Sequence, residues 1–137
     1  MKKLISSILL AASLVSAPVF AQQSDSRQEV VQFQKGSTHA NLQGQIKGYE
    51  TVDYQVRARA GQSMTVDFKP SKSSAYINVL PPESEEALFV GSMSGNHYKG
   101  ALPADGVYRV RVYLMRNAAR RNDVAKYTLN IDVKNGQ

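Results

Sequence analysis

Three arginines, Arg116, Arg120 and Arg121, fall within six positions and are the residues of this sequence best suited to binding chemistry. The guanidinium group is a planar fork of N–H donors that matches carboxylates and phosphates. Arginines on a loop are most often solvated, and that is the plainer interpretation. A strand predicted directly before them, residues 107–114, would however hold these side chains and the intervening Asn117 in a fixed array. The segment therefore predicts a loop that binds an anionic partner.

The chain that leads to this loop alternates between two faces. One face carries Tyr108, Val110, Val112 and Leu114, and the other carries Arg109, Arg111 and Tyr113. A period of two is that of a half-buried strand. The strand follows a turn at Asp105 and Gly106, where glycine supplies the backbone freedom for a sharp reversal. Tyr108 keeps two interpretations, a binding residue or a sandwich corner whose hydroxyl satisfies nearby backbone.

The other polar residues do not assemble a catalytic or metal site. His39 and His97 are the only histidines and are interpreted as surface residues, and there is no cysteine to act as nucleophile or zinc ligand. The acidic run Glu83–Glu86 lacks the pattern of a calcium loop and is interpreted as a solvated turn. Residues 91–95 lack the pattern of a phosphate-binding loop. We expect no enzymatic activity, no metal and no cofactor.

Short alternating segments recur along the chain, separated by turns rich in Gly and Pro. Strands are predicted over residues 30–34, 40–46, 52–56, 64–68, 75–80, 87–90, 107–114 and 127–133. No segment shows sustained helical periodicity, and residues 92–96 are predicted to form a loop. We expect an all-β fold, an antiparallel β-sandwich of about eight short strands in which the turns close hairpins.

The first 21 residues predict a secretory signal peptide, because two lysines precede an apolar run and small residues lead to a cleavage site near Ala21. Residues 22–137 then form one domain, expected to be soluble in the periplasm and without membrane insertion. The formal net charge is +6 at pH 7, and its excess in the last third predicts a partner with an acidic groove. Nucleic acid is disfavoured, because the protein is exported and few aromatic residues interleave with the arginines. Oligomeric state stays open between monomer and homodimer.

Several motifs along residues 22–137 keep the order of a known family. They are Phe33-x-Lys35-Gly36, Gly44-x-Ile46-Lys47-Gly48-Tyr49, Tyr54 before Gly61-Gln62, Leu102-Pro103-Ala104-x-Gly106-x-Tyr108, Arg116-Asn117-x-Ala119-Arg120 and Tyr127. In this order the chain resembles the periplasmic inhibitors of g-type lysozyme, to which the inhibitors of i-type lysozyme are similar in architecture. The resemblance implies a β-sandwich that plugs the active-site cleft of a host lysozyme, evading host defence and protecting peptidoglycan from hydrolysis.

The resemblance also implies the binding residues. The family's Ser-Gly-x-Tyr loop corresponds to residues 105–108 and its arginine loop to residues 116–121, and both are expected at one end of the sandwich. Asp105 replaces the family's serine, and an ionised carboxylate would repel a catalytic carboxylate, so this loop is expected to bind backbone or sugar-site donors instead. The expected lysozyme contacts are Asp105, Gly106, Tyr108, Arg116, Asn117, Arg120 and Arg121.

Two partners and two further function classes remain as alternatives. A g-type lysozyme is preferred, and an i-type lysozyme is the alternative. A non-catalytic, glycan-binding module like the sandwich domains appended to secreted peptidases is the second function class. Such modules usually accompany a catalytic domain, which favours a free inhibitor here. A structural envelope protein without a soluble ligand is the third.

Overall fold

The computed structural model describes residues 13–17 and 25–136. Most of the predicted signal peptide, residues 1–21, and its predicted cleavage site at Ala21 lie outside the described residues. Residues 13–17 have no regular secondary structure. The predicted domain is therefore described from residue 25 onward.

Nine strands and two short helices make up the described part of the chain. In order these are β1 (Ser26–Val30), β2 (His39–Lys47), β3 (Thr51–Ala58), β4 (Ser63–Pro70), β5 (Ala75–Leu80), β6 (Phe89–Val90), α1 (Gly91–Ser94), β7 (His97–Ala101), β8 (Gly106–Leu114), α2 (Arg116–Arg120) and β9 (Val124–Lys134). The helices have only four and five residues. The all-β prediction is therefore confirmed.

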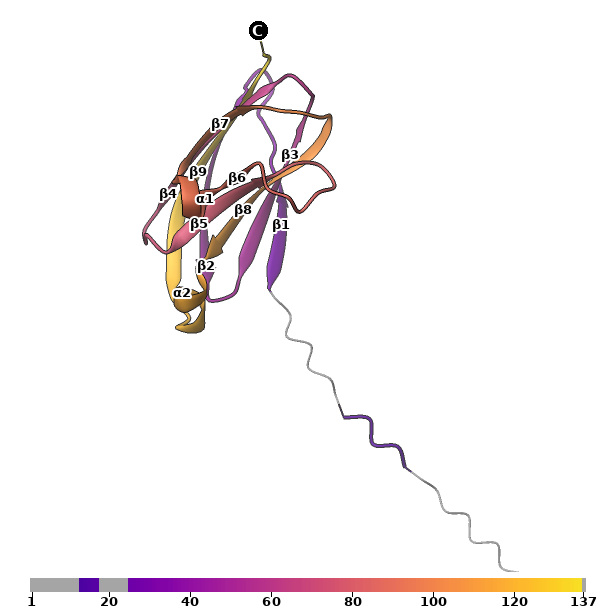
Figure 1. Ribbon diagram of the computed structural model, residues 1–137, viewed down its shortest axis with the longest axis vertical. Helices are drawn as coiled ribbons and strands as arrows, with labels where there is room; N and C mark the ends of the chain where they lie inside the picture. Colours follow the sequence, from indigo (N-terminus) through magenta and orange to yellow (C-terminus); the bar gives the residue numbers. More distant parts are fainter. Residues whose placement is uncertain (1–12, 18–24, 137) are drawn as a thin grey trace, which may run out of the picture.

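The strands form two sheets that pack face to face as a sandwich (Figure 1). The five-stranded sheet has the order β1-β3-β8-β5-β6, and the four-stranded sheet has the order β2-β9-β4-β7. Every ladder is antiparallel except that of the edge strand β1, which runs parallel to β3. The predicted antiparallel sandwich is thus confirmed with one parallel edge.

Most connections of the chain cross from one sheet to the other. β2, β4 and β7 lie in the four-stranded sheet, whereas β3, β5 and β8 lie in the five-stranded sheet, and among the described strands only β5 and β6 are both consecutive and paired. The prediction that the turns close hairpins is therefore wrong. A turn signal marks a reversal of the chain, but the burial of one face of each strand decides which neighbour it pairs with.

The core fills the space between the two inward faces. Its fully buried side chains include Val52 and Val56 of β3, Val110 and Val112 of β8, and Leu129 and Ile131 of β9. Tyr54 and Tyr127 meet across this core, with their hydroxyl oxygens 2.6 Å apart in a hydrogen bond. Burial raises the pKa of both phenols. The two sheets are therefore joined at their centre by a neutral polar link.

The strand boundaries agree best where apolar alternation is strong. The prediction for residues 75–80 coincides with β5, whereas the prediction for residues 30–34 is displaced from β1, an exposed and mostly polar edge strand. β7 was missed, because it buries a single large apolar side chain, that of Tyr98. α2 was missed because one helical turn carries too little periodicity.

β8 runs the length of the domain and separates its two ends (Figure 1). Its nine residues span about 26 Å at roughly 3.3 Å per residue. We call one end the α2 end; it comprises α2 with residues 121–123 after it, the last residue of β2 with the connection that follows, residues 47–50, and the connection after β4, residues 71–74. We call the other the β7–β8 end; it comprises the connections after β3 and β7, residues 59–62 and 102–105.

Candidate functional site

α2 directs its small residues inward and its arginines outward. Ala118 and Ala119 are buried against the end of the core, whereas Arg116 and Arg120 are exposed. The helix is fixed where it begins, because the N–H of Met115 donates to the carbonyl of Ser74 over 2.9 Å. The predicted arginine loop is thus one helical turn on a rigid base.

The three predicted arginines differ in their contacts. Arg121 is engaged within the chain, with Nη2 3.0 Å from Oδ2 of Asp123. Arg116 and Arg120 make no ion pair or side-chain hydrogen bond with any residue that the structure describes, and Asn117 between them is exposed. Side chains four positions apart lie on the same side of a helix. Arg116 and Arg120 therefore form a pair of exposed guanidinium groups on one side of α2, without a partner among the described residues.

The connection between β2 and β3 is held against α2. Gly48 is buried with φ of +61°, and its N–H donates to the carbonyl of Asp123 over 3.0 Å. A Cβ at this position would lie 2.8 Å from Oδ1 of Asn122. Glycine accommodates both the backbone angle and the close approach. This contact brings the neighbouring Tyr49, which is 58% exposed, beside the arginine helix.

Tyr49 is a candidate binding residue that sequence reasoning did not select. Large exposed rings with a polar tip are frequent anchors of protein interfaces. The motif Gly48-Tyr49 was visible in the sequence, but its value depends on the contact with α2. That contact joins residues far apart in the chain, and no local pattern reports it.

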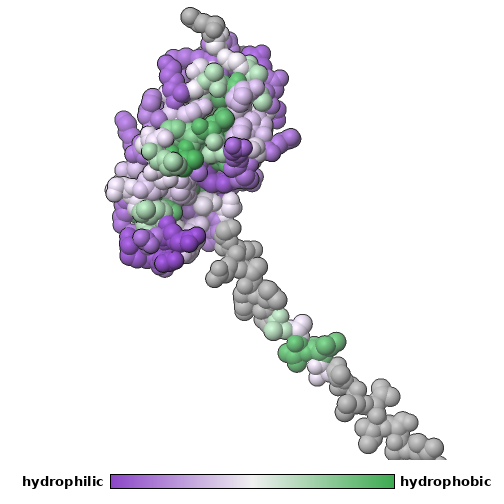
Figure 2. Space-filling model, viewed as in Figure 1, coloured by the Kyte–Doolittle hydropathy of each residue, from purple (hydrophilic) through white to green (hydrophobic). Residues whose placement is uncertain are grey.

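Positive charge gathers at the α2 end. Its helix and connections carry five basic residues against two acidic ones, namely Lys47, Lys72, Arg116, Arg120 and Arg121 against Glu50 and Asp123. Figure 2 shows this end, at the bottom of the domain, as strongly hydrophilic. A surface of this sign attracts an acidic cleft and speeds the encounter with it.

The predicted turn at Asp105 and Gly106 lies at the β7–β8 end. The expectation that it shares one end with the arginine segment is therefore wrong, because the whole of β8 separates them. Asp105 is exposed, and its Oδ1 accepts a hydrogen bond from the N–H of Ala60 over 2.8 Å. The carboxylate thus ties together two connections of its own end.

Tyr108 occupies the sandwich corner, the second of its two interpretations. Its side chain is fully buried. The hydroxyl donates to the carbonyl of Ala104 over 2.7 Å and accepts from the N–H of Ala104 over 3.1 Å. The side chain therefore holds the turn from within and presents no surface to a partner.

Two other arginines are committed to a network on the outer face of the five-stranded sheet. Arg111 donates to both oxygens of Asp53, over 2.7 and 3.0 Å, and Asp53 is only 4% exposed. Hydrogen bonding to Asp53 raises the pKa of Arg111. Arg109 and Arg111 also donate to Glu85, over 2.7 and 3.1 Å, and these bonds hold the pKa of Glu85 below its ordinary value. The network fastens the loop of residues 81–88 to the sheet.

The described residues offer no metal centre, since no three His, Cys, Asp or Glu side chains among them gather as ligands. His97 is instead paired with Asp67, with Nδ1 2.5 Å from Oδ1, and His39 is exposed. In the same part of the chain, no helix has the length and apolar character that crossing a membrane requires.

No family model matches the chain, but comparison with known proteins finds inhibitors of g-type lysozyme among its relatives. An inhibitor of g-type lysozyme from Escherichia coli (strain K12) is 31% identical over 136 residues, which cover 97% of this chain and 98% of that protein. The crystal structure of a periplasmic inhibitor of g-type lysozyme from Aeromonas hydrophila is 36% identical, with a TM-score of 0.75 over 80% of this chain and 98% of that one.

The corresponding structure from Salmonella Typhimurium is 32% identical, with a TM-score of 0.63 over 79% of this chain and 98% of that one. The match therefore spans nearly the whole length of each relative, in sequence as well as in fold. On these grounds the chain belongs to the family of inhibitors of g-type lysozyme.

Proposed function

We propose that this protein inhibits g-type lysozyme in the periplasm by placing its α2 end in the active-site cleft of the enzyme. The relatives are named as inhibitors of g-type lysozyme, which supports the partner, and the solved structures are described as periplasmic, which supports the compartment. The observation that carries the mechanism is the exposed pair Arg116 and Arg120, which has no partner among the described residues. We infer that the pair finds its carboxylate on the enzyme.

The chemistry of glycoside hydrolysis explains why such a pair would inhibit. Glycosidases place carboxyl groups on either side of the bond that they cleave. A guanidinium group binds a carboxylate through two parallel hydrogen bonds, and the interaction strengthens where water is excluded. The backbone of the helix is already fixed by its buried alanines, so little backbone conformational freedom is lost on binding. The α2 end would thus compete with the sugar chain for the same cleft.

The proposal assigns entry into the cleft to the α2 end alone. Asp105 and Gly106 lie at the far end of β8, and the side chain of Tyr108 is buried. A contact of that turn with lysozyme stays a separate prediction. Asp105→Ser distinguishes the two, because entry by the α2 end alone leaves the inhibition constant of this variant unchanged.

The test is an inhibition assay of the protein, purified from a periplasmic extract, against g-, i- and c-type lysozymes. Replacing either Arg116 or Arg120 by alanine removes one buried, hydrogen-bonded charge pair and should weaken inhibition of the g-type enzyme by about 2 to 5 kcal/mol, or at least roughly thirtyfold. Arg121→Ala is the matched control, because Arg121 is paired within the chain. We expect it to change inhibition less than threefold, roughly the loss of a rim contact.

Failure to inhibit any of the three lysozymes would retire the proposal. Inhibition of the i-type enzyme alone would keep the mechanism and change the partner. Equal losses for Arg116→Ala, Arg120→Ala and Arg121→Ala would show that net charge, rather than the free pair, carries the binding.

A further inference from the structure

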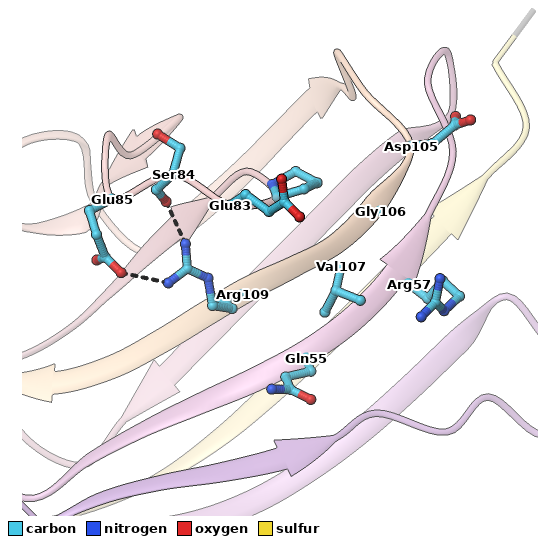
Figure 3. A pocket seen from close by; sticks show the side chains of 10 residues that line it. Gln55, Arg57, Glu83, Ser84, Glu85, Asp105, Gly106, Val107 and Arg109 are labelled. Atoms are coloured by element: carbon cyan, nitrogen blue, oxygen red, sulfur yellow. Dashed lines mark hydrogen bonds and ion pairs between the residues drawn. The ribbon is translucent and has the colours of Figure 1, made fainter.

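A cleft opens at the β7–β8 end, away from the proposed lysozyme surface. It has a volume of about 610 Å³ and lies between the loop of residues 81–88 and the outer face of β3 and β8 (Figure 3). The residues that matter to its chemistry are Gln55, Arg57, Glu83, Asp105, Val107 and Arg109. Small-molecule sites are of about 300 to 1,000 Å³, so the space suits a compact ligand.

The cleft is shaped by contacts that exist without a ligand. A Cβ at Gly106 would lie 2.8 Å from Cβ of Pro82, so the glycine lets the loop rest directly on the beginning of β8. Arg109 fastens the same loop by donating to the carbonyls of Pro81 and Ser84 and to Oε1 of Glu85. The loop of residues 81–88, which forms one side of the cleft, is therefore fixed to β8.

The charges that line the cleft are not equally available. Arg109 and Glu85 satisfy each other, and one oxygen of Asp105 is held by the N–H of Ala60. Arg57 and Glu83 are exposed and make no ion pair or side-chain hydrogen bond with any residue in the described part of the chain. Figure 3 shows Glu83 on the loop side and Arg57 on the β3 side, with Val107 in the region between them.

One class of ligand is complementary to both unpaired charges. A purely anionic ligand would be repelled by Glu83 and Asp105, and a purely cationic one by Arg57. A ligand with a carboxylate for Arg57 and an ammonium group for Glu83 satisfies both, and its short aliphatic part can lie on Val107. We propose that this cleft binds a short zwitterionic peptide, with its carboxylate on Arg57 and its ammonium group on Glu83, independently of the lysozyme surface.

Two sources supply this chemistry outside the cytoplasm, namely stem peptides of the cell wall and ordinary short peptides with both ends free. The test is a titration of the 15N-labelled protein, purified from a periplasmic extract, followed by NMR. One arm uses the tripeptide L-Ala-γ-D-Glu-meso-diaminopimelate, and the other uses trialanine. The control ligand is trialanine with its amino end acetylated and its carboxyl end amidated. We expect the amide signals of Gly106 and Val107 to shift with a charged peptide and not with the blocked one.

Each charge is then removed by substitution with glutamine, which is nearly isosteric with Glu83 and keeps a polar but shorter side chain at position 57. Arg57→Gln and Glu83→Gln should each weaken peptide binding by about tenfold or more, which corresponds to one charge-assisted hydrogen bond. Arg116→Ala at the α2 end should leave peptide binding unchanged, and Arg57→Gln should leave lysozyme inhibition unchanged. The proposed peptide site and the proposed lysozyme surface are therefore tested independently of each other.

Binding of the stem tripeptide alone assigns the site to the cell wall, and binding of both peptides assigns it to short zwitterionic peptides in general. The inference is overturned if neither peptide shifts these signals up to about 10 mM, a concentration that would detect even very weak binding. It is also overturned if the blocked peptide binds equally well, or if binding survives both substitutions.

Discussion

At the scale of single residues, the arginines differ in whether a carboxylate of the same chain lies within hydrogen-bonding distance. Arg109, Arg111 and Arg121 each donate to a carboxylate of their own chain, whereas Arg116 and Arg120 do not within the described residues. Spacing in the sequence singled out the segment but could not rank its members. The bond from Arg111 to Asp53 joins positions 58 apart and depends on the register of β3 with β8, which no local pattern contains.

Tyr108 gives a residue-scale prediction that separates support from contact. Tyr108→Phe removes two hydrogen bonds to the backbone of Ala104 and leaves those groups without this partner. We expect the free energy of unfolding in urea to fall by about 1 to 3 kcal/mol, while the inhibition constant for g-type lysozyme stays unchanged. A loss of inhibition at full stability would instead make the hydroxyl a contact residue.

At the scale of elements, strong alternation predicted strands well and their pairing poorly. β5 and β8 were located from their side-chain period, because each buries a continuous apolar face. The prediction of strand pairing failed because pairing is set by which faces meet in the core. In this sandwich, strands that are neighbours in sequence mostly belong to different sheets. The strand was predicted to end before the arginine segment, as it does, but the helical form of that segment was not predicted. Its place at the end opposite Asp105 depends on the length of β8 and was missed.

Gly48 gives an element-scale prediction about how the β2–β3 connection is positioned. Gly48→Ala imposes a side chain at φ of +61° and 2.8 Å from Oδ1 of Asn122, so the connection must move away from α2. We expect a loss of about 1 to 2 kcal/mol in stability. Since Tyr49 moves with the connection, we also expect a weaker inhibition constant for g-type lysozyme.

Two other glycines provide the matched control for this substitution. Gly36 and Gly61 also have positive φ, +82° and +85°, but a Cβ at either would meet no atom within 4 Å. Alanine there should cost a comparable backbone strain and leave inhibition unchanged. If Gly36→Ala or Gly61→Ala weakened inhibition as much as Gly48→Ala, general destabilisation rather than positioning would explain the effect.

The loop of residues 81–88 gives a prediction about acid. Glu85 accepts from Arg109 and Arg111, and its pKa is therefore lower in the folded protein than the ordinary 4.5. The stabilisation from a lowered carboxyl pKa is present above pH 4.5 and is lost as pH falls through the folded value. The protection factors of the loop amides, which correct for the slower intrinsic exchange in acid, should fall as pH drops through the folded value. In Glu85→Gln these protection factors should be low already at neutral pH; an unchanged profile would contradict the tether.

At the scale of the whole molecule, the Tyr54–Tyr127 link makes the union of the two sheets sensitive to alkali. Both phenols have a pKa raised above the ordinary 10.0 by burial, so they ionise more readily in the unfolded chain. The stability from a raised pKa is complete below pH 10.0 and declines as pH rises above it. We expect a lower urea midpoint at about pH 11 than at about pH 8, and a smaller difference in Tyr127→Phe, which has lost one of the two groups.

The order of strands in the four-stranded sheet has a consequence for biogenesis. β9, residues 124–134, lies between β2 and β4, so among the described strands β2 has its single ladder, and β4 one of its two ladders, with a segment that is synthesised late. Pairing between distant segments closes large loops and slows folding. The four-stranded sheet can therefore be completed only after residues 124–134 have been synthesised, so β2 stays without its ladder until late in the synthesis of the chain.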